Sequence, residues 1–183
     1  MAEIKKITLK NIRIAYPHLH TKGSYDGAEH DKYQADFIIP KDHPQLKELT
    51  AEIKRQMEEA KADNKKIAFE FRKDIQCLVD GDTLGKDYLE GAYRLRGKSK
   101  NPVSLFDKYK NKIEDETLCA SGDYVAAQFT FWTTHKMGGI VGCNLLAVVH
   151  IATGEPIGGG GADLSAFDDI SVADDLDDSI PFL

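Results

Sequence analysis

The chain has 183 residues, a mass of 20.3 kDa and 42% hydrophobic residues, which is typical of one globular domain with a short appendage. It contains no apolar run of the ~18 residues that a membrane-spanning helix needs. The first ten residues also lack the layout of a signal peptide, so we expect a cytoplasmic protein. Three widely spaced cysteines, Cys77, Cys119 and Cys143, argue against a disulfide framework or a zinc finger and should be reduced and mostly buried.

The charge is divided unevenly along the chain. The net charge is -6, but seven of the 30 acidic residues follow Ile157, and no Lys or Arg follows Lys136. Residues 1–157 therefore hold 24 basic and 23 acidic residues, a net charge of +1, against -7 for the remainder. This separation is typical of a binding module with an acidic arm. We predict a binding domain over residues 1–157 and a Gly-rich linker with a disordered acidic tail over residues 158–183.

The first predicted strand, residues 4–16, changes its inward face halfway along. The apolar residues before and after the change have opposite parity: Ile7 and Leu9, then Ile12, Ile14 and Tyr16. A bulge near Lys10 and Asn11 would reconcile the two halves, because one extra residue restores the alternation. A long, bent first strand of this kind suits a small closed barrel.

A loop, a second strand and a helix are predicted next. Residues 17–31 carry turn-forming residues and predict a loop, and residues 32–39 alternate as a strand. The inward side chains of that strand are Tyr33, Ala35, Phe37 and Ile39. Pro40 ends the strand, and Pro44 marks a helix start with Asp42 or His43 as its cap. The apolar stripe of this helix of about five turns is Leu46, Leu49, Ile53, Met57 and Ala60, and we expect it to cover the barrel.

The middle of the chain has weaker patterns. Residues 66–72 predict a strand that residues 75–79 continue, and residues 80–82 predict a turn. Tyr93 and Leu95 form a short inward-facing pair. The stretch 97–117 has no clear period, and we interpret it as a long loop that orders on a ligand.

Two strong strands close the domain. Residues 124–134 and 143–152 alternate clearly and are joined around Met137, Gly138 and Gly139, which predicts a hairpin. The chain thus has about five strands, one helix between early strands and no βαβ alternation. We predict a mainly β protein with an oligonucleotide-binding (OB) fold, a five-stranded Greek-key barrel with one amphipathic helix. A β-sandwich is the alternative.

Residues 93–112 combine cations with aromatic rings. This segment holds seven cationic side chains and one acidic side chain, with three aromatic rings between them. The candidate DNA-binding residues in it are Tyr93, Arg94, Arg96, Lys98, Lys100, Phe106, Lys108, Tyr109, Lys110 and Lys112. In an extended chain the cations at positions 94–100 share one edge at ~6.7 Å intervals, and those at positions 108–112 form a second row. Single-strand binding needs both types, because cations neutralise phosphates while rings stack on bases. A solvated, lysine-rich loop is the alternative interpretation.

Trp132 and Lys136 are candidates in the predicted hairpin. The core face of residues 124–134 is Val125, Ala127, Phe129 and Phe131, which leaves Trp132 on the other face among Thr and Gln residues. An outward Trp on a barrel is a stacking platform for bases. The competing interpretation is that the helix or a loop covers it.

The sequence offers little support for catalysis. Four aspartates could bind magnesium in a nuclease: Asp74, Asp80, Asp82 and Asp87. Two of them belong to the predicted turn, and no spacing brings the other two together. A zinc site built from His18, His20 and His30 or His43 lacks a cysteine pair. We therefore expect no enzyme, no cofactor and no metal site.

The C-terminal residues resemble the acidic tip of bacterial single-stranded DNA (ssDNA)-binding proteins. The acidic part and the apolar tip of this tail are Asp174, Asp175, Asp177 and Asp178, followed by Ile180, Pro181, Phe182 and Leu183. In the bacterial proteins the Phe is the last residue, whereas Leu183 follows it here. A solvated arm of this kind is expected to dock its tip on a partner. It could also compete with DNA for the cations of the domain.

Two further stretches carry a resemblance over the whole chain. Residues 10–19 read Lys-Asn-Ile-Arg-Ile-Ala-Tyr-Pro-His-Leu, and residues 143–161 run from Cys-Asn-Leu-Leu-Ala-Val-Val-His to four glycines. Together with the tail they resemble the phage ssDNA-binding proteins. The resemblance implies an OB barrel that coats ssDNA in phage replication and recombination inside the infected host, with a tail that contacts replication proteins.

Our hypothesis is a sequence-independent ssDNA-binding protein, monomeric or homodimeric, that uses no membrane. The alternatives are a metal-dependent phage nuclease and a DNA-mimicking inhibitor of a host enzyme.

Overall fold

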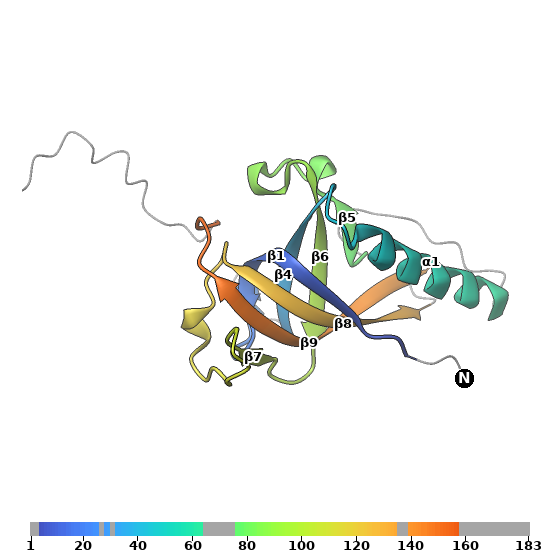
Figure 1. Ribbon diagram of the computed structural model, residues 1–183. Helices are drawn as coiled ribbons and strands as arrows, with labels where there is room; N and C mark the ends of the chain where they lie inside the picture. Colours follow the sequence, from blue (N-terminus) through green and yellow to red (C-terminus); the bar gives the residue numbers. More distant parts are fainter. Residues whose placement is uncertain (1–3, 26–27, 30–31, 64–75, 135–138, 158–183) are drawn as a thin grey trace, which may run out of the picture.

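Five strands close into a barrel in the computed structural model, which describes residues 4–25, 28–29, 32–63, 76–134 and 139–157 (Figure 1). The barrel strands are β1 (Ile7–His18), β4 (Tyr33–Pro40), β6 (Ala92–Ser99), β8 (Tyr124–Thr134) and β9 (Ile140–Ala152). Neighbours pair antiparallel in the order β6-β4-β1-β8-β9, and a parallel contact between β6 and β9 completes the ring at Lys98 and Asn144. This connectivity confirms the predicted Greek-key OB barrel over a sandwich.

Short strands extend the barrel at its edges. β5 (Leu78–Asp80) pairs with β6, and β7 (Ser104–Phe106) runs parallel to β9. The predicted loop after β1 contains a small ladder of β2 (Ser24–Tyr25) and β3 (Ala28–Glu29). Three single 3-10 turns complete the described elements: Gly81–Thr83, Asp87–Leu89 and Glu116–Leu118. The first of them confirms the turn predicted at residues 80–82.

β1 contains the predicted bulge. Its register against β8 shifts between Leu9 and Ile12, and Asn11 adopts a positive φ of 56°. The shift lets side chains of both parities face inward, so that Ile7, Leu9, Ile12 and Ile14 are each 0–1% exposed. A second irregularity at Tyr16 was not predicted, and its φ of 51° turns the end of the strand.

α1 (Leu46–Asp63) covers the barrel as its apolar stripe predicted. Leu49 and Ile53 are buried in the core, and Leu46 and Met57 pack against it. Helix α1 begins two residues after Pro44, and the backbone N–H of Gln45 donates to Nδ1 of His43 just before it. Within the described part of the chain, no helix is both long and apolar enough to span a membrane.

The core faces of β4 and β8 are also as predicted. Ala35, Phe37 and Ile39 are buried, and the rings of Phe37 and Phe129 meet edge to face with centroids 5.0 Å apart. Gly97 of β6 faces the same interior. A Cβ atom there would lie 3.0 Å from the Cβ of Leu145, so the absence of a side chain allows β6 and β9 to close the ring.

The predicted long loop over residues 97–117 is wrong in part. β6 continues to Ser99, and β7 forms within the stretch. Likewise Tyr93 and Leu95 belong to an eight-residue strand instead of a short pair. The alternation was hidden because β6 places glycine at position 97 on its inner face and cations on its outer face. The predicted strand at residues 66–72 and the turn at residues 137–138 lie outside the described residues.

All three cysteines are free and buried, as predicted. Burial raises the pKa of the Cys77 and Cys119 thiols to about 12, and that of Cys143 also rises. These thiols are therefore structural side chains and not reactive ones.

Candidate nucleic-acid interface

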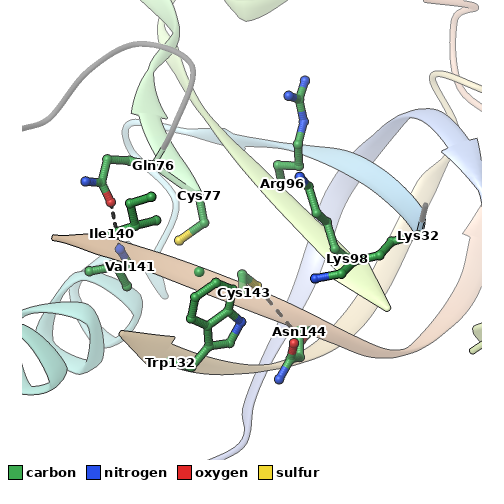
Figure 2. Close-up of a pocket in the computed structure, with 11 residues that line it drawn as sticks. Lys32, Gln76, Cys77, Arg96, Lys98, Trp132, Ile140, Val141, Cys143 and Asn144 are labelled. Atoms are coloured by element: carbon green, nitrogen blue, oxygen red, sulfur yellow. Dashed lines mark hydrogen bonds between the residues drawn. The ribbon is translucent and has the colours of Figure 1, made fainter. Parts of the chain in front are cut away.

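A cavity of about 310 Å³ is lined by residues of β6, β8 and β9 and of the segment before β5. Figure 2 draws Trp132 beside β9 and Lys32 and Lys98 on the β6 side, with the guanidinium of Arg96 pointing away from Trp132. The lining residues are Lys32, Gln76, Cys77, Arg96, Lys98, Trp132, Ile140, Val141, Gly142, Cys143 and Asn144. We call this space the Trp132 cavity. It brings three of the predicted site residues together, namely Arg96, Lys98 and Trp132.

Trp132 lies on the outer face of β8, as its parity predicted. Its side chain is 38% exposed, while Phe131 beside it in the chain is 5% exposed and faces the core. The alternative in which the helix or a loop covers Trp132 does not hold. A partly exposed indole offers an aromatic face to a ligand.

Arg96 is held rigidly in the wall of the cavity. Its Nε and Nη2 donate to the two carboxylate oxygens of Asp36 at 2.7 and 3.0 Å. Asp36 is 7% exposed, and its hydrogen bond raises the pKa of Arg96. A bidentate pair of this kind fixes the plane of the guanidinium, which points away from Trp132 (Figure 2). Lys98, two residues further along the same face, is exposed.

Arg94 shares that face but is not available to a ligand. It is 6% exposed, and its Nη2 donates to the backbone oxygen of Gln76 at 3.1 Å. Burial lowers the pKa of Arg94, and its Nε has no hydrogen-bond partner among the described residues. The parity argument correctly grouped Arg94 with Arg96 and Lys98. The alternation could not show that the segment before β5, at Gln76, covers Arg94.

The second predicted row of cations does not form, which corrects the extended model of residues 108–112. The carboxylate of Asp107 accepts hydrogen bonds from the backbone N–H groups of Tyr109 and Asn111, and Lys110 has a φ of 69°. These contacts fold the segment into a tight turn, so that Lys108, Lys110 and Lys112 do not share one edge.

The other predicted aromatic residues lie away from the Trp132 cavity. Phe106 and Lys110 line a separate, mostly apolar hollow of about 410 Å³ over β7, β8 and β9. Tyr109 is 73% exposed in the turn next to that hollow. Tyr93 stands at the opposite end of β6 from Lys98, with Nζ of Lys41 5.6 Å from its ring centroid. The cavity therefore has one aromatic platform among the predicted residues.

Several functional candidates were missed from the sequence. Lys32, just before β4, and Asn144 of β9 line the cavity, and Gly142 stands opposite Trp132 in the hairpin ladder. Counting the register back from the turn could have paired residues 132 and 142. Lys100, just after β6, is not among the described residues that line the cavity, and the predicted contact Lys136 and the tail lie outside the described residues.

Two of the carboxylates considered for catalysis, Asp80 and Asp82, have structural contacts, and Asp74 lies outside the described residues. Nζ of Lys41 lies 3.0 Å from Asp80 and 2.6 Å from Asp82, and Asp80 also accepts from the backbone of Asp82 in the turn. Across the described ranges, no group of three or more His, Cys, Asp or Glu residues is placed to hold a metal ion.

Comparison with known proteins gives the family. The sequence family of the ssDNA-binding protein of Enterobacter phage Enc34 matches residues 5–178. The chain belongs to this family. Another relative, the protein p50 of Acyrthosiphon pisum secondary endosymbiont phage 1, is 32% identical over 178 residues, which cover 93% of this chain and 96% of the relative.

Solved structures show the same barrel as this Enc34-family chain. The ssDNA-binding protein of bacteriophage Enc34, solved in complex with ssDNA, is similar with a TM-score of 0.68 and 23% identity, covering 84% of this chain and 89% of that one. The ssDNA-binding protein gp2.5 of bacteriophage T7 is similar with a TM-score of 0.60 and 16% identity, covering 93% and 100%. At these identities the likeness establishes the fold of the Enc34-family chain.

Proposed function

We propose that this chain binds ssDNA independently of sequence, without catalysis, and that the Trp132 cavity is the centre of its binding site. One observation carries the proposal: a partly exposed indole and three cationic residues, Lys32, Arg96 and Lys98, line one cavity. The family and the Enc34 complex with ssDNA support it. Arg94 is omitted from the proposed contacts because it is buried.

The chemistry of the cavity suits single strands of any sequence. Lysine and arginine neutralise phosphates, whose spacing does not depend on the bases. An aromatic face stacks on any base, but only when that base is not already stacked and paired in a duplex. Phe106 and Tyr109 would contact a longer DNA single strand that extends beyond the Trp132 cavity.

The biological setting is part of the proposal. We infer that the protein coats and protects ssDNA during phage replication and recombination in the cytoplasm of the infected host. The acidic tail of residues 158–183 would recruit replication or recombination proteins and compete with DNA for the cations of the barrel. A net charge of -7 on the tail against +1 on residues 1–157 supports this competition.

Salt titration of oligo-dT binding tests the proposal. For the wild-type protein the plot of log affinity against log salt should have a slope of about -2 or steeper, because each neutralised phosphate contributes ~-0.7. Lys98→Met should make the slope less steep by about one contact. Arg94→Met is the matched control on the same strand and face, and it should leave the slope unchanged because that guanidinium is buried. A flat wild-type slope, or magnesium-dependent cleavage of the oligonucleotide, would contradict the proposal.

Removal of the tail tests the competition. A chain ending at Gly161 should bind ssDNA more tightly than the full chain and discriminate less against duplex, because an intramolecular polyanion no longer occupies the cations. Gel shifts of both proteins on single and double strands measure this. Unchanged affinities would leave the tail with a recruiting role alone. If neither protein bound DNA, the inhibitor that mimics DNA would be favoured.

A further inference from the structure

The indole of Trp132 rests on the backbone of β9 at Gly142. The two residues are direct partners in the antiparallel ladder of β8 and β9. A Cβ atom built on Gly142 would lie 2.1 Å from Cζ2, 2.2 Å from Cε2 and 2.7 Å from Cη2 of the ring. All three distances are far below van der Waals contact, so no residue other than glycine leaves the ring in this position.

The glycine is required by the ring and not by the backbone. Gly142 is absent from the described residues with positive φ, and it lies within regular pairing of β8 with β9. An alanine or valine could adopt this extended conformation, and valine is favoured in strands. The three nearest atoms to a Cβ at position 142 therefore all belong to one side chain, that of Trp132.

The ring lies directly at Gly142 of β9, and Trp132 is 38% exposed. It lines the cavity together with Lys98 and Asn144 (Figure 2). A volume of about 310 Å³ is near the lower limit for ligand pockets, which begin at ~300 Å³. It suits one planar ring with its attached phosphate better than a longer stretch of strand.

We propose that Gly142 is the positioning residue of a subsite for a single unpaired nucleobase, which stacks on the open face of Trp132 while Lys98 and Lys32 hold the adjoining phosphate. The inference rests on the proposed function and deepens it. A side chain at position 142 pushes the ring off β9 and removes the platform, although it leaves the cationic residues of the cavity unchanged in the sequence.

Fluorescence tests the inference directly, because Trp132 is the single tryptophan of the chain. In the full-length wild-type protein, oligo-dT should quench this emission as it binds. Gly142→Val should abolish the quenching and weaken the affinity by ~5- to 150-fold, the range for losing one stacked base. The salt slope should stay at the wild-type value, since the phosphate contacts remain. Ala147→Val, on the same face of β9 but opposite Gln128, is the matched control and should behave as wild type.

A double-mutant cycle tests the positioning role of Gly142 even if Gly142→Val lowers the stability of the protein. In the Trp132→Ala background Gly142→Ala should cost no further affinity, because the ring it displaces is already gone. An additive loss would overturn the positioning role, as would wild-type quenching and affinity in Gly142→Val. Absence of ssDNA binding by the wild-type protein would instead overturn the proposed function, so the two failures are distinguishable.

Discussion

Asp123→Ala is expected to destabilise the barrel by about 3 kcal/mol, the cost of leaving several buried donors without a partner. Asp123 is 3% exposed and joins three segments. Its carboxylate accepts from the backbone N–H of Ala120 at 3.0 Å, from that of Gly154 at 3.1 Å and from Nε2 of His150 at 2.8 Å. The start of β8 and the end of β9 are thus held together by one side chain.

Urea denaturation and thermal unfolding followed by circular dichroism measure this effect. The melting temperature should fall by roughly 6–12 °C for a chain of this size. Asp107→Ala is the control, because that carboxylate also accepts backbone hydrogen bonds but lies in an exposed turn. A loss for Asp123→Ala no larger than that of the control would contradict the proposed role of the buried carboxylate.

The same carboxylate predicts a pH dependence. Burial opposes ionisation of Asp123, but the hydrogen bonds from Ala120, Gly154 and His150 outweigh it and lower the pKa below the usual 3.8. A carboxyl whose pKa is lowered on folding contributes stability above its unfolded pKa, and this contribution is lost as the pH falls through the folded pKa. The stability gap between wild type and Asp123→Asn should therefore narrow as the pH falls below about 4.

Much of the fold was predictable because its strands bury one face against a single core. Alternation in such strands records which side chains point inward, and a break in the alternation records a bulge. The reversal between Leu9 and Ile12 therefore located the irregularity of β1, and the bounds of β8 at residues 124–134 were confirmed. β6 was underestimated because its outer face carries Arg94, Arg96 and Lys98, a composition that resembles a solvated loop.

The candidate site was only partly predictable. The alternation along a strand shows to which side of the sheet a side chain points, but not which residues of other segments lie next to it. The alternation placed Trp132 outward, which the 38% exposure confirms, and it grouped Arg94 with Arg96. Whether an outward cation reaches solvent depends on what another segment places over it, and Gln76 covers the first arginine while Asp36 fixes the second. Gly142 has no side chain to produce a pattern, so its role emerges only from its register opposite Trp132.

Trp132→Ala is expected to weaken ssDNA binding by ~1–3 kcal/mol, or about 5- to 150-fold, if a base stacks on the indole. The exposed ring is the aromatic platform of the cavity, and its removal leaves the cations of Arg96 and Lys98 in place. The affinity should therefore fall at every salt concentration while the salt slope stays constant. Anisotropy titrations of labelled oligo-dT at several salt concentrations measure both quantities.

Two variants separate stacking from a general loss of surface. Trp132→Phe should keep part of the affinity, because a smaller ring can still stack. Tyr124→Ala removes another exposed aromatic side chain from the same face of β8, 42% exposed and lying under the guanidinium of Arg13 at 5.6 Å from the ring centroid. Because Tyr124 stands at the far end of the strand from the Trp132 cavity, this variant should bind ssDNA as the wild type does. Equal losses for Tyr124→Ala and Trp132→Ala would show that the cavity is not the place where bases stack.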